Sequence, residues 1–366
     1  MYLITNRATK RERGGLDIFL STPSPEGANN LRIAKITGRG SSTRAEMLPD
    51  ELSARRLQQL ERTYRLTLDP KETYYRSLEM ACLLSDQARK EKKHILFYVH
   101  GYNNDVADIV ASVRQMERQY PNLLVVPFSW PAKGGGALSG TANYLDDKRD
   151  ARVSSGALDR VFEHIRSTHQ LLVEAQNKEL WEAAKRRHGA NLEAARAAFA
   201  AAQARVCKVS INLMCHSMGC YVLKYATLPA AAKIRTVIFD NVCLVAADTN
   251  NHDHIAWVQE IEVKGGVYVV INEDDNALQW SRRKPGDEQR ARLGHYLHGL
   301  NASNGVYVDI TRASGVGAEH SYFKGKVVRD NAKLGRLFGK MFSGDRPERF
   351  SSQMTYAADI NAYRLK

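Results

Sequence analysis

The strongest chemical pattern in the chain surrounds Ser217. An apolar run leads into CHSMG (215–219), and residues with helical spacing follow. This order matches the nucleophile elbow G-x-S-x-G, a tight strand-to-helix turn that exposes the serine Oγ above a sheet. Gly219 is the small residue after the serine, and Cys215 stands where the pattern has its first glycine. The helix start would direct N–H groups at developing negative charge, with the backbone of Met218 as one oxyanion donor.

A second pattern, HGYNN (100–104), follows the apolar run 94–99. In folds with a nucleophile elbow, a loop after such a strand supplies the second oxyanion N–H. Gly101 permits close backbone approach. The backbone of Tyr102 would donate the N–H, with His100 and Gly101 supporting the loop.

An acidic loop follows the apolar run 267–271, at the place where such a fold carries the acid that holds the base. Asp275, Asp274 and Glu273 are candidates in this loop. Asp248, after an earlier apolar run, is the rival, and it could instead cap a helix.

The base must be a histidine that comes after the acid. His295, His298 and His320 qualify by position. His320 is favoured because it follows a glycine-rich loop after the apolar run 306–310, where a mobile loop delivers the base. The order serine, acid, histidine is that of the α/β-hydrolases. His216, beside Ser217, is expected to pack under the turn.

Taken in order, these motifs resemble the α/β-hydrolase family of bacterial proteins labelled as a domain of unknown function, DUF900, in the esterase/lipase superfamily. The resemblance covers roughly residues 94–330. It implies a Ser–Asp–His triad on a mostly parallel sheet, with Asp275 as the acid. The motifs that carry it are HGYNN (100–104), PFSWP (127–131), CHSMG (215–219), AAD (246–248), DDNAL (274–278), SRR (281–283) and HSYF (320–323).

The expected elements fit this fold class. Continuous apolar runs, typical of strands covered on both faces, alternate with segments of helical spacing. The sequence therefore predicts an α/β-hydrolase fold, a mostly parallel sheet with helices on both faces, with the N-terminal strands as an antiparallel pair at its edge. The expected strands are 2–5, 31–36, 94–99, 123–128, 208–214, 236–240 with 242–245, 267–271 and 306–310, and the expected helices are 72–91, 106–119 and 218–227.

Two segments depart from that rhythm. Residues from about 155 to 205 are rich in helix formers and are expected to form an inserted helical hairpin. From Lys324 onward the chain holds ten basic and four acidic residues. We expect a hydrolase domain over 1–325, with the insertion at about 155–205, and a basic C-terminal extension over 326–366 packed on it.

Composition narrows the class of protein. The chain has 366 residues, a net charge of +13 and five cysteines, an odd number that argues against a disulfide framework. There is no apolar run of signal-peptide or membrane-spanning length, so a cytoplasmic protein is expected. The basic tail suggests contact with an anionic membrane surface, whereas nucleic acid is disfavoured because no stacking aromatics accompany the charges.

Metal chemistry has weak support. Asp248, His252, Asp253 and His254 are close in sequence, but histidines two residues apart do not share a helix face. No metal and no cofactor is expected. The sequence predicts a serine hydrolase for a small-molecule or lipid carboxylic ester. The alternatives are a (phospho)lipase or thioesterase at a membrane, and a non-catalytic binding protein that kept the fold.

Overall fold

The computed structural model describes residues 1–134, 140–205, 209–228, 237–283, 290–349 and 353–365. Its centre is a run of parallel strands in one large sheet, each hydrogen-bonded to its neighbour. In spatial order these strands are β12 (Gly305–Asp309), β11 (Gly266–Ile271), β10 (Asn241–Val245), β9 (Ile211–His216), β7 (His94–Val99) and β8 (Leu123–Ser129).

The N-terminal strands extend this sheet differently from the prediction. β1 (Tyr2–Thr5) pairs antiparallel with β5 (Arg32–Thr37), as expected, but it also pairs parallel with β8. The pair is therefore not the edge, because β6 (Arg44–Met47) and β3 (Arg13–Gly14) continue the sheet beyond β5. A separate small sheet joins β2 (Arg7–Thr9) and β4 (Phe19–Pro23).

The basic C-terminal segment is built into the same sheet. β14 (Ala362–Leu365) pairs parallel with β12, and β13 (Met354–Ala357) pairs antiparallel with β14. Before them lie α10 (Lys326–Asp330) and α11 (Ala332–Phe342). The apolar side of α11 is fully buried through Leu334, Leu337, Phe338 and Met341. These residues thus belong to the fold's core and do not form a free tail.

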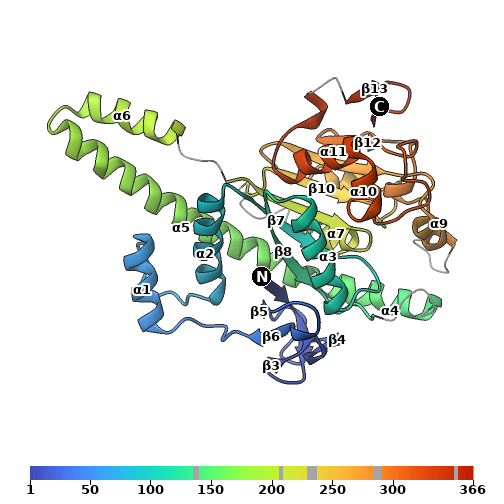
Figure 1. Cartoon of the computed structure of the whole chain (residues 1–366), viewed down its shortest axis with the longest axis horizontal. Helices are drawn as coiled ribbons and strands as arrows, with labels where there is room; N and C mark the ends of the chain where they lie inside the picture. The colour runs from blue at the N-terminus through green and yellow to red at the C-terminus, as the bar shows by residue number, and fades with distance from the viewer. Residues whose placement is uncertain (135–139, 206–208, 229–236, 284–289, 350–352, 366) are drawn as a thin grey trace.

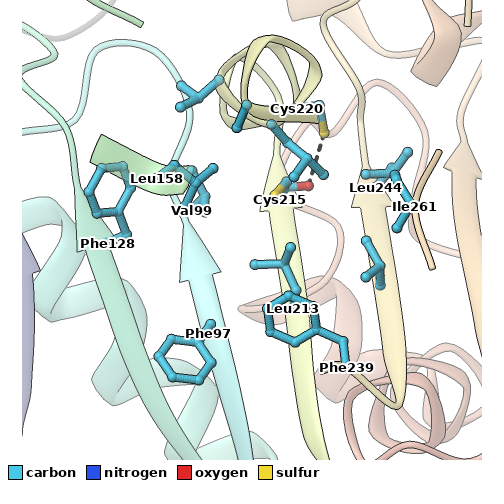
Figure 2. Packing of buried hydrophobic residues seen from close by; sticks show 14 of the residues in the cluster. Phe97, Val99, Phe128, Leu158, Leu213, Cys215, Cys220, Phe239, Leu244 and Ile261 are labelled. Atoms are coloured by element: carbon cyan, nitrogen blue, oxygen red, sulfur yellow. Dashed lines mark hydrogen bonds between the residues drawn. The ribbon is translucent and has the colours of Figure 1, made fainter. Parts of the chain in front are cut away.

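Helices cover both faces of the sheet at its centre, which explains why the central strands are largely apolar. Ile95, Phe97 and Val99 of β7 pack with residues of α2, α5 and α7, whereas Leu96 and Tyr98 pack on the other face with residues of α3 and α11. Figure 2 shows the first of these clusters from close by. The helices are α2 (Arg76–Glu91), α3 (Val106–Gln119), α5 (Ser155–His188) and α7 (Gly219–Thr227).

The segment from 155 to 205 forms a helical hairpin. The 34-residue α5 ends at a turn around Gly189, and α6 (Leu192–Arg205) packs back on it, with the rings of Trp181 and Phe199 edge to face at 5.8 Å. The start of α5 lies on the sheet, and the rest of the hairpin projects away from it (Figure 1). The remaining helices are α1 (Ala54–Tyr64), α4 (Gly140–Val153), α8 (Ile255–Val258) and α9 (Asn276–Arg283).

One expected strand is wrong over its described part. Residues 237–240 are not a strand, and residue 236 lies outside the described residues. The apolar pattern there reflects packing under α5, where the Phe239 ring meets that of Phe162 edge to face at 5.4 Å. The strand expected from 208 begins at Ile211. Among the described helices, none has the length and apolar character needed to cross a membrane.

Candidate active site

Ser217 lies in a strained turn between β9 and α7. Its φ of 54° is in the left-handed region, which costs a non-glycine residue roughly 1–2 kcal/mol. Three backbone hydrogen bonds hold it there: the Ser217 N–H donates to Val245 O at 3.0 Å, and Ser217 O accepts the N–H groups of Cys220 at 3.0 Å and Asp248 at 3.2 Å. A Cβ at Gly219 would lie 2.5 Å from Val99 O, so only glycine fits there. This is the geometry of a nucleophile elbow.

Cys215 occupies the position of the first glycine in that pattern. It is fully buried in β9 between Val99 and Leu244 on the neighbouring strands, and its carbonyl accepts the Cys220 thiol at 3.1 Å (Figure 2). Burial raises the pKa of the Cys215 thiol well above its ordinary value, which keeps it neutral. Cys215 therefore packs in the hydrophobic core, where its neutral, buried thiol is unsuited to act as a nucleophile.

The two expected oxyanion donors approach the serine from different loops. The Met218 N–H has no hydrogen-bond partner among the described residues, so it is available to an incoming group. A Cβ at Gly101 would lie 2.8 Å from the Ser217 Cβ. The missing side chain at Gly101 thus lets the loop that carries Tyr102 pass directly against Ser217.

His100 is a structural residue of this loop. Trp130 N–H donates to its Nε2 at 3.1 Å, so the proton sits on Nδ1, which donates to Gly101 O at 2.8 Å. The His100 and Trp130 rings stack at 4.9 Å. Burial lowers the pKa of His100 to about 3, so the ring stays neutral and ties the ends of β7 and β8 together.

The two asparagines of HGYNN shape the same loop. Asn103 has a φ of 57°, a conformation that asparagine adopts more readily than most residues. The Asn104 amide donates to Tyr102 O at 2.7 Å and to Gly101 O at 3.2 Å. His100 also donates to Gly101 O, so the carbonyl groups of Gly101 and Tyr102 are both fixed by hydrogen bonds. Since C=O and N–H point opposite ways across a trans peptide, this sets the direction of the Tyr102 N–H.

His320 and Asp275 are brought together. His320 Nδ1 lies 2.7 Å from Asp275 Oδ2, and the Asp275 side chain is 0% exposed against 24% for the histidine. The other Asp275 oxygen accepts the Leu278 N–H at 3.1 Å, at the start of α9. The carboxylate is thus anchored to a helix end and fixes the imidazole with Nδ1 protonated and Nε2 unprotonated.

The loop that carries His320 is fixed by hydrogen bonds from Asn272 and His216. The Asn272 amide donates to Gly317 O at 2.9 Å and to Glu319 O at 3.2 Å. His216 Nε2 donates to His320 O at 3.1 Å, and their rings lie 4.7 Å apart. Burial lowers the pKa of His216 well below its ordinary value, so it stays neutral. His216 is therefore a packing residue, and its contact with His320 adds to the sequence-based expectation that it packs under the turn at Ser217.

Asp248, the rival acid, is placed in a different network. Its Oδ1 pairs with Arg292 Nε at 3.0 Å and accepts Ser281 Oγ at 2.5 Å, while its Oδ2 accepts Tyr144 OH at 3.0 Å. The side chains of Asp248 and Arg292 are 3% and 1% exposed. Asp248 thus forms a buried ion pair between loops, without a histidine partner among the described residues.

This pairing predicts a defect of folding for Asp248→Asn. The change leaves the Arg292 charge buried and unpaired, and we expect a loss of about 3–5 kcal/mol in the free energy of unfolding. Urea unfolding measures it. The control is Asp253→Asn, an exposed carboxylate, which should stay within about 0.5 kcal/mol of the parent. Equal stability of the two variants would contradict the buried ion pair.

The other candidates for the acid and the base have different surroundings. Asp274 and Glu273 are exposed, and Glu273 Oε1 accepts the Leu297 N–H at 3.2 Å. His295 is buried, and neither ring nitrogen has a partner among the described residues. The His298 ring packs on Tyr296 at 4.7 Å.

The residues considered for a metal are dispersed. His254 is buried between Asn251 O at 2.6 Å and Tyr307 OH at 2.6 Å, whereas His252 is exposed and bonds to Asp253. Over the described ranges no group of three or more His, Cys, Asp or Glu side chains could hold a metal ion.

A mostly parallel sheet with helices on both faces and a nucleophile elbow after β9 defines the α/β-hydrolase fold. Comparison with known families agrees: residues 78–173 match the model of the family described as "Alpha/beta hydrolase of unknown function (DUF900)". The matched range contains HGYNN, while Ser217, Asp275 and His320 lie beyond it. No curated protein and no solved structure matches the chain.

Proposed function

We propose that this protein is a serine hydrolase that cleaves carboxylic esters through an acyl-enzyme on Ser217. The observation that carries the proposal is the buried Asp275 carboxylate bonded to His320 Nδ1, in a fold that holds Ser217 at a strained elbow. A solvated acidic loop would not place a fully buried carboxylate on a histidine. The alternatives, a thioesterase or lipase and a non-catalytic binding protein, are outcomes of the test below.

In the first half-reaction, Ser217 Oγ attacks the ester carbonyl carbon while His320 Nε2 takes the hydroxyl proton. The carbonyl oxygen becomes an oxyanion facing the N–H groups of Met218 and Tyr102. When the tetrahedral species collapses, the bond to the alcohol oxygen breaks, and His320 gives its proton to that oxygen. Asp275 keeps the imidazole in the required tautomer and stabilises its cationic form.

In the second half-reaction, water replaces the alcohol. His320 Nε2 takes a proton from the water as its oxygen bonds to the acyl carbon, and the same N–H groups face the new oxyanion. Release of Ser217 Oγ, which takes the proton back from His320, frees the acid. Each step uses residues of this chain and water, so the mechanism needs no cofactor.

The basic tail bears on where the enzyme acts. Because the apolar side of α11 is buried, an anionic membrane would meet only its charged side. We propose at most an electrostatic contact, which salt weakens. A cytoplasmic location is proposed from the odd number of cysteines, which favours a reducing compartment.

The proposed reaction is tested with p-nitrophenyl esters from acetate to palmitate. We expect the purified protein to hydrolyse part of this series, with the preferred chain length defining the acyl site. The parallel thioester series separates esterase from thioesterase. Absence of turnover on every ester would overturn the ester assignment. Turnover of thioesters alone would assign a thioesterase.

A further inference from the structure

A carboxylate on α4 holds the loop that carries Tyr102. Asp147 is fully buried, and its Oδ2 accepts the Asn103 N–H at 3.2 Å. Its Oδ1 accepts the Lys133 N–H at 2.9 Å. Asn103 follows β7 and Lys133 follows β8, so one side chain joins the loops after two neighbouring strands.

A buried cation holds the same two loops by their carbonyls. Arg7 in β2 donates to Asn104 O at 2.9 Å, to Ala132 O at 2.9 Å and to Ser129 Oγ at 2.8 Å. Its guanidinium forms no ion pair with a carboxylate among the described residues. Burial lowers the pKa of Arg7 to about 10, so it remains charged at neutral pH. The Asp147 carboxylate therefore accepts hydrogen bonds from N–H groups of the two loops, and the Arg7 guanidinium donates hydrogen bonds to their C=O groups.

The carboxylate acts on the peptide next to the expected oxyanion donor. Asp147 holds the N–H of the Tyr102–Asn103 peptide, and Asn104 holds its C=O. Losing the first bond frees this plane to rotate at Asn103, whose φ is already strained at 57°. The Tyr102 N–H lies one peptide earlier. His100 and Asn104 would still hold the Gly101 C=O of that peptide, but the chain after Tyr102 would no longer be fixed, so the direction of the Tyr102 N–H would vary more widely. We propose that Asp147 is a positioning residue that orients the Tyr102 N–H for the oxyanion, an inference that rests on the proposed function.

The charged groups around Asp147 give this proposal a pH signature. The pKa of Asp147 is raised to about 6, mainly by burial and partly by the charge of Asp150 on the same helix, while the N–H donors of Lys133 and Asn103 and the Lys133 charge oppose the rise. Arg7 also faces it, and Asp105 acts on Arg7. A protonated carboxyl has an O–H where an acceptor is needed, so one N–H loses its partner. The hold on the loop should therefore be nearly complete at pH 8, be about half lost near pH 6 and weaken further at lower pH.

The experiment compares the parent protein with Asp147→Asn, and with Asp150→Asn as the matched control. Both variants lose one carboxylate from α4, but no hydrogen bond joins the described Asp150 side chain to either loop. The fold should tolerate Asp147→Asn, because a raised pKa means that the ionised form is already disfavoured by burial. Equal melting temperatures of the three proteins check this.

With the ester that the parent hydrolyses best, Asp147→Asn should lower kcat at pH 8 by roughly 10- to 100-fold and leave KM nearly unchanged. A misdirected N–H donor reduces the stabilisation of the transition state and has little effect on the binding of the substrate. The ratio of parent to variant kcat should shrink as pH falls below about 6. Asp150→Asn should match the parent at pH 8, and the loss of its charge should move the pH dependence that Asp147 gives to kcat toward lower pH.

Two results overturn the inference. One is unchanged kcat in Asp147→Asn, and the other is a ratio that does not vary with pH, which would mean a purely structural role. Failure of the proposed function looks different, because the parent protein itself would then show no Ser217-dependent turnover.

Discussion

Ser217→Ala should abolish ester hydrolysis, lowering kcat by about 10⁴-fold or more, because it removes the hydroxyl that carries the acyl group in the proposed mechanism. The neighbouring Cys215 cannot substitute, since it is buried and its thiol is held neutral. Residual hydrolysis would come from the oxyanion donors alone. Steady-state kinetics on the best ester measures the loss. Retention of a tenth of the parent activity would contradict the role of Ser217.

A matched variant, Ser217→Gly, separates the chemistry from the backbone. Both variants lack the hydroxyl and should be equally inactive. At a φ of 54° glycine avoids the strain that alanine keeps, so Ser217→Gly should unfold at a free energy about 1 kcal/mol above that of Ser217→Ala. Equal stability of the two variants in urea would mean that the turn is not strained.

Asp275→Asn should lower kcat by roughly 10⁴-fold with little loss of stability. The amide can turn its NH₂ toward His320, which favours the tautomer that lacks a free Nε2. The fold should survive because asparagine caps a helix as well as aspartate does, and the Leu278 N–H keeps an acceptor. Kinetics together with a melting curve measures both effects.

The control for this variant is the adjacent carboxylate. Asp274 is exposed and its side chain makes no hydrogen bond among the described residues, so Asp274→Asn should keep kcat within about two-fold of the parent. If Asp274→Asn proved the more damaging change, the acid would have to be reassigned.

The part of the site that sequence could predict is the part written in contiguous residues. The elbow needs a strand, a serine, a small residue and a helix in immediate succession, and CHSMG supplies them. HGYNN works in the same way. Its glycine and asparagines act on one another within five residues, so a tight loop at the end of the strand could be predicted, whereas the individual bonds of His100 and Asn104 could not.

The supporting groups could not be predicted, because their partners are far away in the chain. Asp147 is 44 residues from Asn103, and Arg7 is 97 residues from Asn104. Asp147 and Arg7 both bind backbone groups of their partners. Because every residue type carries these groups, the partner positions leave no pattern in the sequence. Asp248 illustrates the reverse case: an aspartate after a buried strand fits two roles, and only its contact with Arg292 distinguishes them.

The edges of the sheet were misjudged for a related reason. Strand pairing depends on which chain segments meet in space, and short polar strands leave little local signal. β14 has only four residues, of which Ala362 alone is buried, and it extends the sheet from within the segment expected as an extension. The long apolar strands at the centre were clear because both of their faces are covered.

The most direct measurement of the central claim is covalent labelling with a fluorophosphonate, followed by mass spectrometry of the modified peptide. A serine activated by His320 and Asp275 should react, with the adduct on Ser217 and no labelling in Ser217→Ala. Labelling should also fall sharply in Asp275→Asn. A parent protein that stays unlabelled, or carries the adduct on another residue, would contradict an acyl-enzyme at Ser217.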